Sequence, residues 1–267
     1  MSNDRLGPQR KQWTRLVKPM PAQVLPIGVI ADEKSWMQVE SDLFERRQQT
    51  AQSIRAQYDG REHGLIGTAT DQLTAASCIS HAACAVADAR RRLVGLGSIP
   101  LSPNYLHCCL LRLESDLGTR ADWLAERVKK EGVPRSVGGE QNLEAPKQCP
   151  ALGKVGRFAV SHFYRFETEK EVKQEILLHG PVIAHMYLFD DFWRKYGGGI
   201  YYAPKKTSAY QHAVTLIGFD DKQGYWIGKN SRGNGWGENG CFKIAYGECG
   251  ILSDGLPVYS FDMTPEI

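Results

Sequence analysis

The chain has 267 residues and a net charge of +3, with 42% hydrophobic and 24% charged residues. This composition is typical of a globular protein, and it excludes a fibre, a repeat array or a largely disordered chain. No apolar run reaches the roughly 20 residues of a membrane helix, so we expect no membrane span. The mild positive charge comes without a nucleic-acid-binding motif, so we expect no nucleic-acid partner.

The chain contains seven cysteines, an odd number spread over its whole length. This pattern differs from the dense, even spacing of a small disulfide scaffold. No Cys-x-x-Cys pair or Cys/His spacing suits zinc, so we expect no metal site and no other cofactor. At least one thiol lies outside any disulfide, and it needs either a function or a buried position.

The first 57 residues differ in character from the rest of the chain. Residues 1–33 contain several prolines and are expected to be irregular, whereas residues 34–57 carry apolar side chains at helical spacing. This spacing predicts one amphipathic helix. A loop rich in Gly and Thr is expected over residues 59–77.

Three further helices are predicted next. The alanine-rich segment that begins at Cys78 favours a helix, and its run of arginines suits a helix C-terminus. Ser102 as N-cap and Pro103 at the first helical position begin another. A third covers residues 120–131 and is ended by Gly132.

After about residue 153, alternating β-branched and aromatic residues predict strands. The predicted strands cover residues 157–166, 181–188, 198–203, 212–219, 224–230 and 241–246. One predicted helix, 169–180, interrupts them. Helices first and strands later indicate an α+β protein of two lobes, with the cleft between the lobes as the natural place for chemistry.

Cys78 is the candidate nucleophile. It follows a polar loop at the start of a predicted helix, where unpaired backbone N–H groups and the helix dipole favour the thiolate. Cys84 lies six residues later inside the same helix and is interpreted as a small buried side chain.

Two histidines compete as the base for this thiol. His212 begins an apolar strand, and His81 lies one helical turn after Cys78. A neighbour on the same helix projects along the helix surface, whereas catalysis needs a base that faces the nucleophile, so His212 is preferred. Asn230 ends the strand that we expect to pair with the His212 strand, where its side chain can orient the imidazole.

The segment KNSRGNGWGENG, residues 229–240, is interpreted as the support for Asn230. Its glycines permit positive φ and close backbone approach, and Trp236 is a large anchor.

These segments together resemble the papain family of cysteine peptidases. The similarity is carried, in family order, by TATDQLTAASC, LSPNYLHCC, EILLHGPV, GGIYY, HAV, YWIGKNSRGNGWGENG and GECGI. It covers about residue 58 to the end. The resemblance implies a papain-like two-lobed fold, with a helical lobe over about 72–150 and an antiparallel β-barrel-like lobe over about 151–267.

The resemblance also assigns roles. Cys78 is the expected nucleophile, His212 the base, Asn230 the orienting residue and Gln72 an oxyanion donor beside the Cys78 backbone N–H. The expected substrate contacts are made by Gly118, Ala213, Trp236 and Asp254. An acidic Asp254 at the base of the pocket for the side chain two residues before the cleaved bond would favour Arg or Lys there. The expected partner is a peptide or protein substrate.

The sequence departs from the family pattern in four ways. Ala75 and Ile79 flank the nucleophile segment without the usual nearby cysteine, and Lys205 occupies the position of another disulfide partner. Cys109 or Cys108 with Cys149 is the remaining family-like disulfide. This relaxed framework is typical of a bacterial-style or intracellular member.

The most consequential departure is Arg232, which replaces the Trp that usually follows Asn-Ser and shields the Asn–His hydrogen bond. Its stem and planar guanidinium can stack in that place, while its charge disfavours a neighbouring imidazolium. We expect activity with an altered pH profile. Gln211 before His212 is a minor change.

Residues 1–57 lie outside the resemblance to the mature domain 58–267. They are expected to be an inhibitory prosegment that acts on the same chain, with a permanent arm as the alternative. The chain is expected to be a monomer. Its location is left open between a bacterial cytoplasm and export without a visible signal peptide.

Two alternative functions remain open. A papain-like acyltransferase or deamidase that acts on a protein side chain would carry the same catalytic residues. An inactive binding scaffold has Arg232 as its support.

Overall fold

The structure is a computed structural model that describes residues 55–113, 118–119, 121–136, 149, 157–158, 160–204, 210–253 and 256–263. Lys205 and Asp254 lie outside these ranges. Of the helix predicted over residues 34–57, only 55–57 are described, and Gln57 begins a strand rather than ending a helix.

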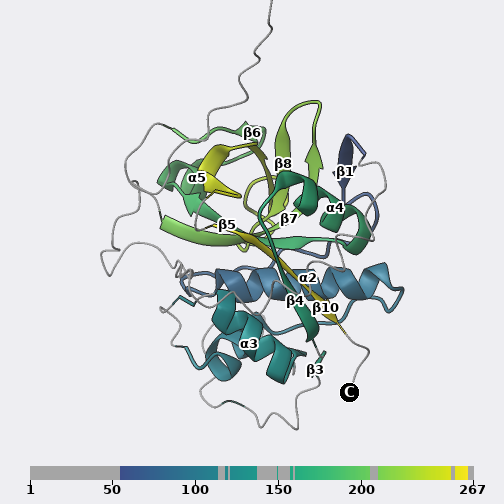
Figure 1. Ribbon diagram of the computed structural model, residues 1–267. Helices are drawn as coiled ribbons and strands as arrows, with labels where there is room; N and C mark the ends of the chain where they lie inside the picture. Colours follow the sequence, from purple (N-terminus) through teal and green to yellow (C-terminus); the bar gives the residue numbers. More distant parts are fainter. Residues whose placement is uncertain are drawn as a thin grey trace, which may run out of the picture.

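The described part of the chain contains both helices and strands, with the following bounds. The helical elements are α2 (Cys78–Leu93), the π-helix η3 (Tyr105–Leu110), α3 (Ala121–Glu131), α4 (Glu169–His179), α5 (Asp190–Lys195) and the 3-10 turn η5 (Glu248–Gly250). The strands are β1 (Gln57–Asp59), β2 (Val133–Pro134), β3 (Arg157–Phe158), β4 (Val160–Phe166), β5 (Val182–Leu188), β6 (Ile200–Tyr201), β7 (Tyr210–Asp220), β8 (Tyr225–Lys229), β9 (Cys241–Ala245) and β10 (Val258–Met263). Helix α2 crosses the middle of the molecule, with the main sheet on one side and α3 on the other (Figure 1).

The four helices predicted after residue 77 are confirmed, with one difference of type. Helix α2 begins at Cys78, and α4 begins with a capping box between Thr168 and Glu171 and ends at Gly180. The Ser102 hydroxyl accepts the Tyr105 backbone N–H at 3.0 Å, which satisfies one N–H at the start of the predicted third helix. That helix continues as the wider π-helix η3.

The main sheet has eight strands, in the order β4-β10-β5-β7-β8-β9-β6, with β1 also paired to β7. Its pairs are antiparallel except for β6 with β9, which is parallel. We expected a barrel-like lobe, but among the described strands the sheet is open. Strands β4 and β6 lie at opposite ends of the strand order and do not pair, so no hydrogen bonds close the ring.

Strand β1 ties the start of the described chain into this sheet. Tyr58 pairs with Phe219, and a Cβ built on Gly218 would meet the Tyr58 carbonyl oxygen at 2.2 Å. Only glycine allows this approach. The domain boundary that we expected between residues 57 and 58 therefore falls within a strand.

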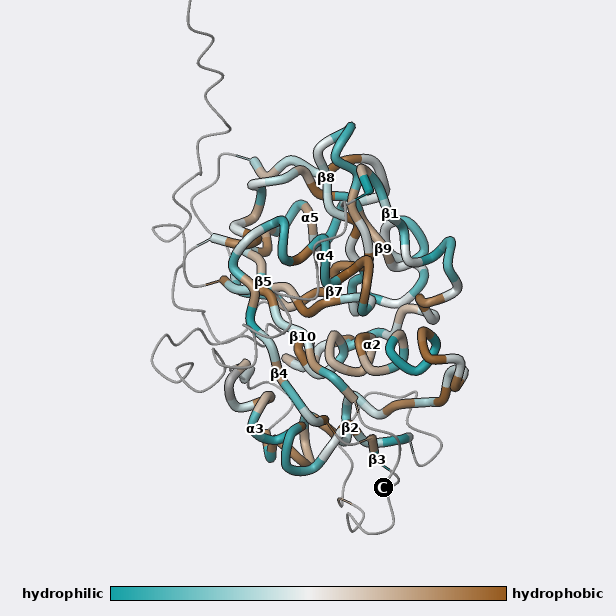
Figure 2. The backbone as a smooth tube through the Cα atoms, turned by 45° about the vertical axis from the view of Figure 1, so that its right-hand side comes forward, coloured by the Kyte–Doolittle hydropathy of each residue, from teal (hydrophilic) through white to brown (hydrophobic). Residues whose placement is uncertain are grey.

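Two hydrophobic cores lie on opposite faces of β5 and β7. Val182, Ala184 and Val214 pack into the core of the β lobe, whereas Ile183 and Ala213 pack into the core around α2. This alternation follows the period of two of a strand. Apolar residues line β7 and α2 where the two elements pack together (Figure 2). The α+β class with two lobes is confirmed, and the N-terminus of α2 is held against β7.

A buried ion pair holds the far end of α2. The Arg90 guanidinium donates to Glu175 of α4 and to the Ser260 hydroxyl of β10, each at 2.5 Å. Arg90 is 7% exposed and Glu175 is 3% exposed. Separating the pair would leave each member as an uncompensated buried charge, which is strongly unfavourable. The contact therefore fixes α2 to the β lobe.

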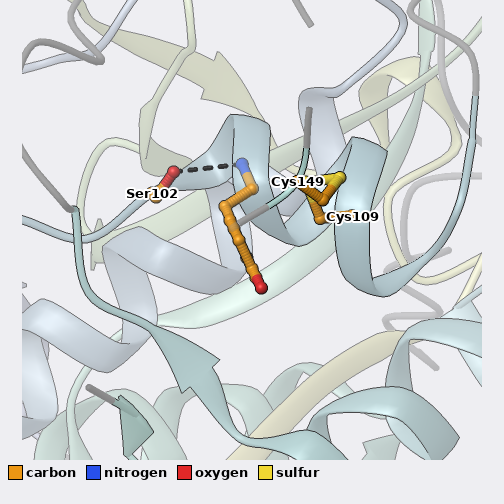
Figure 3. Close-up of a disulfide and its surroundings, with 4 residues drawn as sticks. Ser102, Cys109 and Cys149 are labelled. Atoms are coloured by element: carbon orange, nitrogen blue, oxygen red, sulfur yellow. Dashed lines mark hydrogen bonds between the residues drawn. A yellow bond between two sulfur atoms is a disulfide. The ribbon is translucent and has the colours of Figure 1, made fainter. Parts of the chain in front are cut away.

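Cys109 and Cys149 form the disulfide that the resemblance implied (Figure 3). Cys249 is buried outside any disulfide. Among the described residues, no helix has the length and apolar character needed to cross a membrane.

Candidate active site

Cys78 is the first residue of α2, and the packing of α2 on β7 sets its position. Its Sγ accepts the backbone N–H of Ala213 at 3.4 Å. Ala213 directly follows His212 on β7, so the thiol lies beside the histidine that the sequence analysis preferred. The Cys78 side chain is fully buried in the intact chain.

His212 and Asn230 lie together just beyond the paired part of the β7–β8 hairpin. The His212 Nε2 and Asn230 Oδ1 atoms are 2.9 Å apart and buried. An amide oxygen only accepts, so Nε2 carries the proton of the neutral ring and Nδ1 keeps its lone pair. Nδ1 is buried and has no hydrogen-bond partner among the described residues. This tautomer leaves Nδ1 available to take a thiol proton.

The loop after Asn230 holds that residue in place. The Asn230 backbone N–H donates to the Gly240 carbonyl at 2.9 Å, so the loop folds back on itself. Gly240 has φ +81°, and a Cβ there would lie 2.2 Å from the Ala69 Cβ, so no other residue fits. The Trp236 indole donates to the Trp193 carbonyl at 3.0 Å and packs edge-on against Phe192. Glycine spacing and a Trp anchor thus serve to fix Asn230.

Gln72 is tied to the same loop through Ser231, a residue that the sequence analysis did not single out. Gln72 Oε1 accepts the Ser231 hydroxyl, and the Gln72 backbone N–H donates to the Ser231 carbonyl at 2.9 Å. Gln72 Nε2 donates to the Ala75 carbonyl at 2.7 Å. The Gln72 amide is a neutral N–H donor, the type of group that can stabilise an oxyanion.

The His212 ring contacts Trp193, a residue that sequence reasoning also missed. The two rings meet edge to face with centroids 5.4 Å apart. The Arg232 guanidinium carbon lies 4.3 Å from the centroid of the Trp193 ring, which confirms that Arg232 stacks. Trp193 belongs to the short helix α5, and its position over a histidine far along the chain has no local sequence signal.

Burial lowers the pKa of His212 to about 4, although the Asn230 hydrogen bond acts in the opposite direction and favours the imidazolium. The charge of Arg232 lowers this pKa further. His212 is therefore neutral at neutral pH, and its chemistry in this state is that of a base.

His81, the rival base, has different partners. Its Nδ1 lies 2.6 Å from the Thr70 hydroxyl, and its Nε2 is buried without a partner among the described residues. Burial lowers its pKa to about 3, with smaller contributions from His107, Lys229 and His212. In the part of the chain that the structure describes, no carboxamide is hydrogen-bonded to His81, so the geometry favours His212.

The remaining predicted site residues lie at different distances from the catalytic contacts, and one of them is not described. Ala213 is buried beside the thiol, and Trp236 is half-buried against α5. Gly118 is half-buried, and no described contact joins it to the catalytic residues. Asp254 lies outside the described residues. Among the described residues, no cluster of three or more His, Cys, Asp or Glu side chains could hold a metal ion.

Comparisons with known proteins agree with this fold. The family model described as "Papain family cysteine protease" matches residues 54–258. The chain therefore belongs to the papain family of cysteine proteases. A curated relative, "Cathepsin B" of Dictyostelium discoideum, is 36% identical over 120 residues, which cover 42% of this chain and 38% of that protein. "Cysteine protease" of Blomia tropicalis is 28% identical over 201 residues, or 70% of this chain and 60% of that protein.

The chain thus spans about two fifths and three fifths of the length of these two relatives. Solved structures share the fold at lower identity. "proCathepsin B S9 from Trypanosoma congolense" is similar with a TM-score of 0.68 and 18% identity, and the match covers 94% of this chain and 88% of that one. Procathepsin L 3 of Tenebrio molitor gives a TM-score of 0.68 at 22% identity, covering 79% and 71%.

Proposed function

We propose that this protein is a peptidase that cleaves peptide bonds through a Cys78 thioacyl intermediate. The single observation that supports it best is the pair of contacts around His212. Its Nε2 is hydrogen-bonded to Asn230 Oδ1 at 2.9 Å, and the backbone N–H of the neighbouring Ala213 donates a hydrogen bond to the Cys78 sulfur at 3.4 Å. A nucleophile, a base and an orienting group are thereby within one small volume.

In this mechanism, His212 Nδ1 takes the proton of the Cys78 thiol and the thiolate attacks the substrate carbonyl carbon. The oxyanion accepts hydrogen bonds from Gln72 Nε2 and the Cys78 backbone N–H. The imidazolium then gives its proton to the leaving amine as the C–N bond breaks. Water, deprotonated by His212, attacks the thioester and releases the acid and the Cys78 thiol.

We also propose that the segment before Arg55 restrains the enzyme. The Cys78 and His212 side chains have no exposed surface in the intact chain, so a peptide reaches them only after a rearrangement. Relatives with the same fold bear names with the prefix "pro". Release should follow a cut before Arg55, because Gln57 and Tyr58 are paired with β7.

A labelling experiment tests both proposals. A protease recognition sequence is inserted between residues 54 and 55, so that the full chain folds before it is cut. Each form is incubated with a peptidyl epoxide, which alkylates an activated thiol, and its intact mass is measured. A Cys78→Ala variant is the matched control.

One adduct at Cys78 only after the cut would support a restrained peptidase, and equal labelling before and after would refute the restraint alone. No adduct in either form would refute the peptidase. Labelling without turnover of any member of a peptide panel would favour acyl transfer or deamidation instead.

A further inference from the structure

A cavity of about 770 Å³ lies beside α2 and is separate from the catalytic contacts. Among the described residues it is lined by loop 67–71, one face of α2, segment 98–104, Ser136 and Lys229 of β8. Cavities of 300–1,000 Å³ are typical of small-molecule sites. The proposed peptidase chemistry makes no use of this space.

The α2 side of the cavity is a single stripe of the helix. His81, Ala85, Asp88 and Arg92 recur every three or four residues and therefore lie on one face. Ala85 is a small residue in the middle of the stripe, which leaves room beside the helix. Ile99 and Leu101 add apolar surface to the lining.

Most of the charged side chains that line the cavity already have a hydrogen-bond or ion-pair partner. Arg92 Nε lies 2.9 Å from the Asp88 carboxylate, which also accepts the Ser98 hydroxyl at 2.5 Å. Asp71 accepts the Leu73 backbone N–H at 2.8 Å and is half-exposed, so water screens its charge.

Lys229 is the exception. It is 9% exposed and lines the cavity, and no hydrogen bond or ion pair of its ammonium is found among the described residues. Burial lowers the pKa of this lysine. The described carboxylate that acts on this ammonium is Asp88, which already pairs with Arg92 and Ser98. The Lys229 charge at the wall of the cavity is therefore only partly matched, and a further anion beside it would be stabilised.

His81 adds a polar atom on the same side. Its Nδ1 contacts the Thr70 hydroxyl, and its Nε2 is buried without a partner among the described residues. When Nδ1 accepts the Thr70 proton, the neutral ring carries its own proton at Nε2 and can donate it.

We propose that the cavity binds a small organic molecule that carries one carboxylate. The carboxylate lies against the Lys229 ammonium, and the apolar body packs against Ala85, Ile99 and Leu101. A second cavity, of about 10 Å³, shares Lys229 and His81 with the large one and is also lined by Cys78 and Asn230. Its size suits about one water molecule, so the organic ligand stays in the large cavity.

Binding is tested on the full chain by isothermal titration calorimetry. The probes are 2-naphthoate and its uncharged match, 2-naphthamide. We expect the naphthoate to bind at least tenfold more tightly than the amide. In Lys229→Met, which keeps the apolar stem, the naphthoate affinity should fall about 30-fold and the preference should vanish. Lys222→Met removes an exposed lysine that does not line the cavity and should bind as the natural chain does.

Ala85→Leu provides a second test that leaves every charge in place. It fills the space beside α2 and should weaken both probes. Equal binding of naphthoate and naphthamide, or the same naphthoate affinity in Lys229→Met and Lys222→Met, would overturn the proposal and leave a water-filled cavity. The readout is binding rather than turnover, so the result is independent of whether Cys78 is an active nucleophile.

Discussion

His212 and His81 are both buried imidazoles near Cys78, yet their surroundings differ. His212 has an amide oxygen on Nε2 and an indole ring packed against it at nearly a right angle, and both Asn230 and Trp193 make further contacts. His81 has one hydroxyl partner and borders an open cavity. The contrast shows that burial alone does not make a catalytic base, because a base also needs a group that fixes its tautomer and orientation.

The largest expected effect separates the two histidines by activity. His212→Gln should lower kcat/KM for a peptide by about 1,000-fold or more, because the thiol loses its general base. His81→Gln should lower it by less than about tenfold, since no proton transfer uses that ring. Initial rates after the cut before Arg55 check this. A larger loss in His81→Gln than in His212→Gln would reverse the assignment.

The next effect concerns the oxyanion. Gln72→Ala should lower kcat by about 100-fold, equivalent to about 3 kcal/mol, because one preorganised donor is lost. Ser231→Ala removes only the contact that holds Gln72 and should cost less than Gln72→Ala. Steady-state kinetics of the two variants provide the measurement, and an unchanged kcat in Gln72→Ala would exclude its role.

Acid should destabilise the fold through these same rings. Burial lowers the pKa of His81 to about 3 and that of His212 to about 4, below the ordinary value of 6.5. The unfolded chain therefore binds protons that the folded chain does not. Their contribution is fully present above pH 6.5 and is lost as the pH falls toward 4. Each pKa unit corresponds to about 1.4 kcal/mol of unfolding free energy.

Urea unfolding of the Cys78→Ala chain at pH 7.0, 5.5 and 4.5 measures this loss. The decline should be shallower in His81→Gln, which removes one of the titrating groups. A free energy of unfolding that stays constant from pH 7.0 to 4.5 would contradict the neutral state of these rings.

The smallest expected effect concerns Arg232, which stacks on Trp193 beside His212, and its influence on the His212 pKa. The charge of Arg232 lowers the His212 pKa, so Arg232→Gln should raise it, by about one unit or less. Arg232→Lys keeps the charge and should leave it closer to the natural value. NMR titration of the His212 ring in the Cys78→Ala background reports the pKa directly. A lower pKa in Arg232→Gln would show that Arg232 acts by packing alone.

Local signals accounted for much of the fold. The start of α2 at Cys78 follows from its alanine-rich sequence, and the β7–β8 hairpin that brings His212 to Asn230 follows from two apolar runs around a turn. The two-lobed α+β class was also predictable from the order of helices and strands, and the roles of the site residues stay predictions.

The missed features depend on contacts between distant segments. Helix α5 has six residues, too few for a helical period to be visible in the sequence. It carries Trp193, whose ring contacts His212. Strand β10 was not among the predicted strands, and it pairs with β4 about 100 residues away. The cavity is lined by a loop, one face of a helix and one lysine from separate parts of the chain, so no single stretch of sequence predicts it.

The ion pair at Arg90 has a mechanical consequence. Arg90 lies twelve residues after Cys78, about 18 Å along the axis of α2, and it is clamped to both Glu175 and Ser260. Helix α2 is thus attached to the β lobe at both ends, through Arg90 at one and through the contact of Cys78 with Ala213 at the other. Two attachments this far apart fix the direction of the helix axis as well as its position, so the Arg90 contact helps to align the thiol with His212 from a distance.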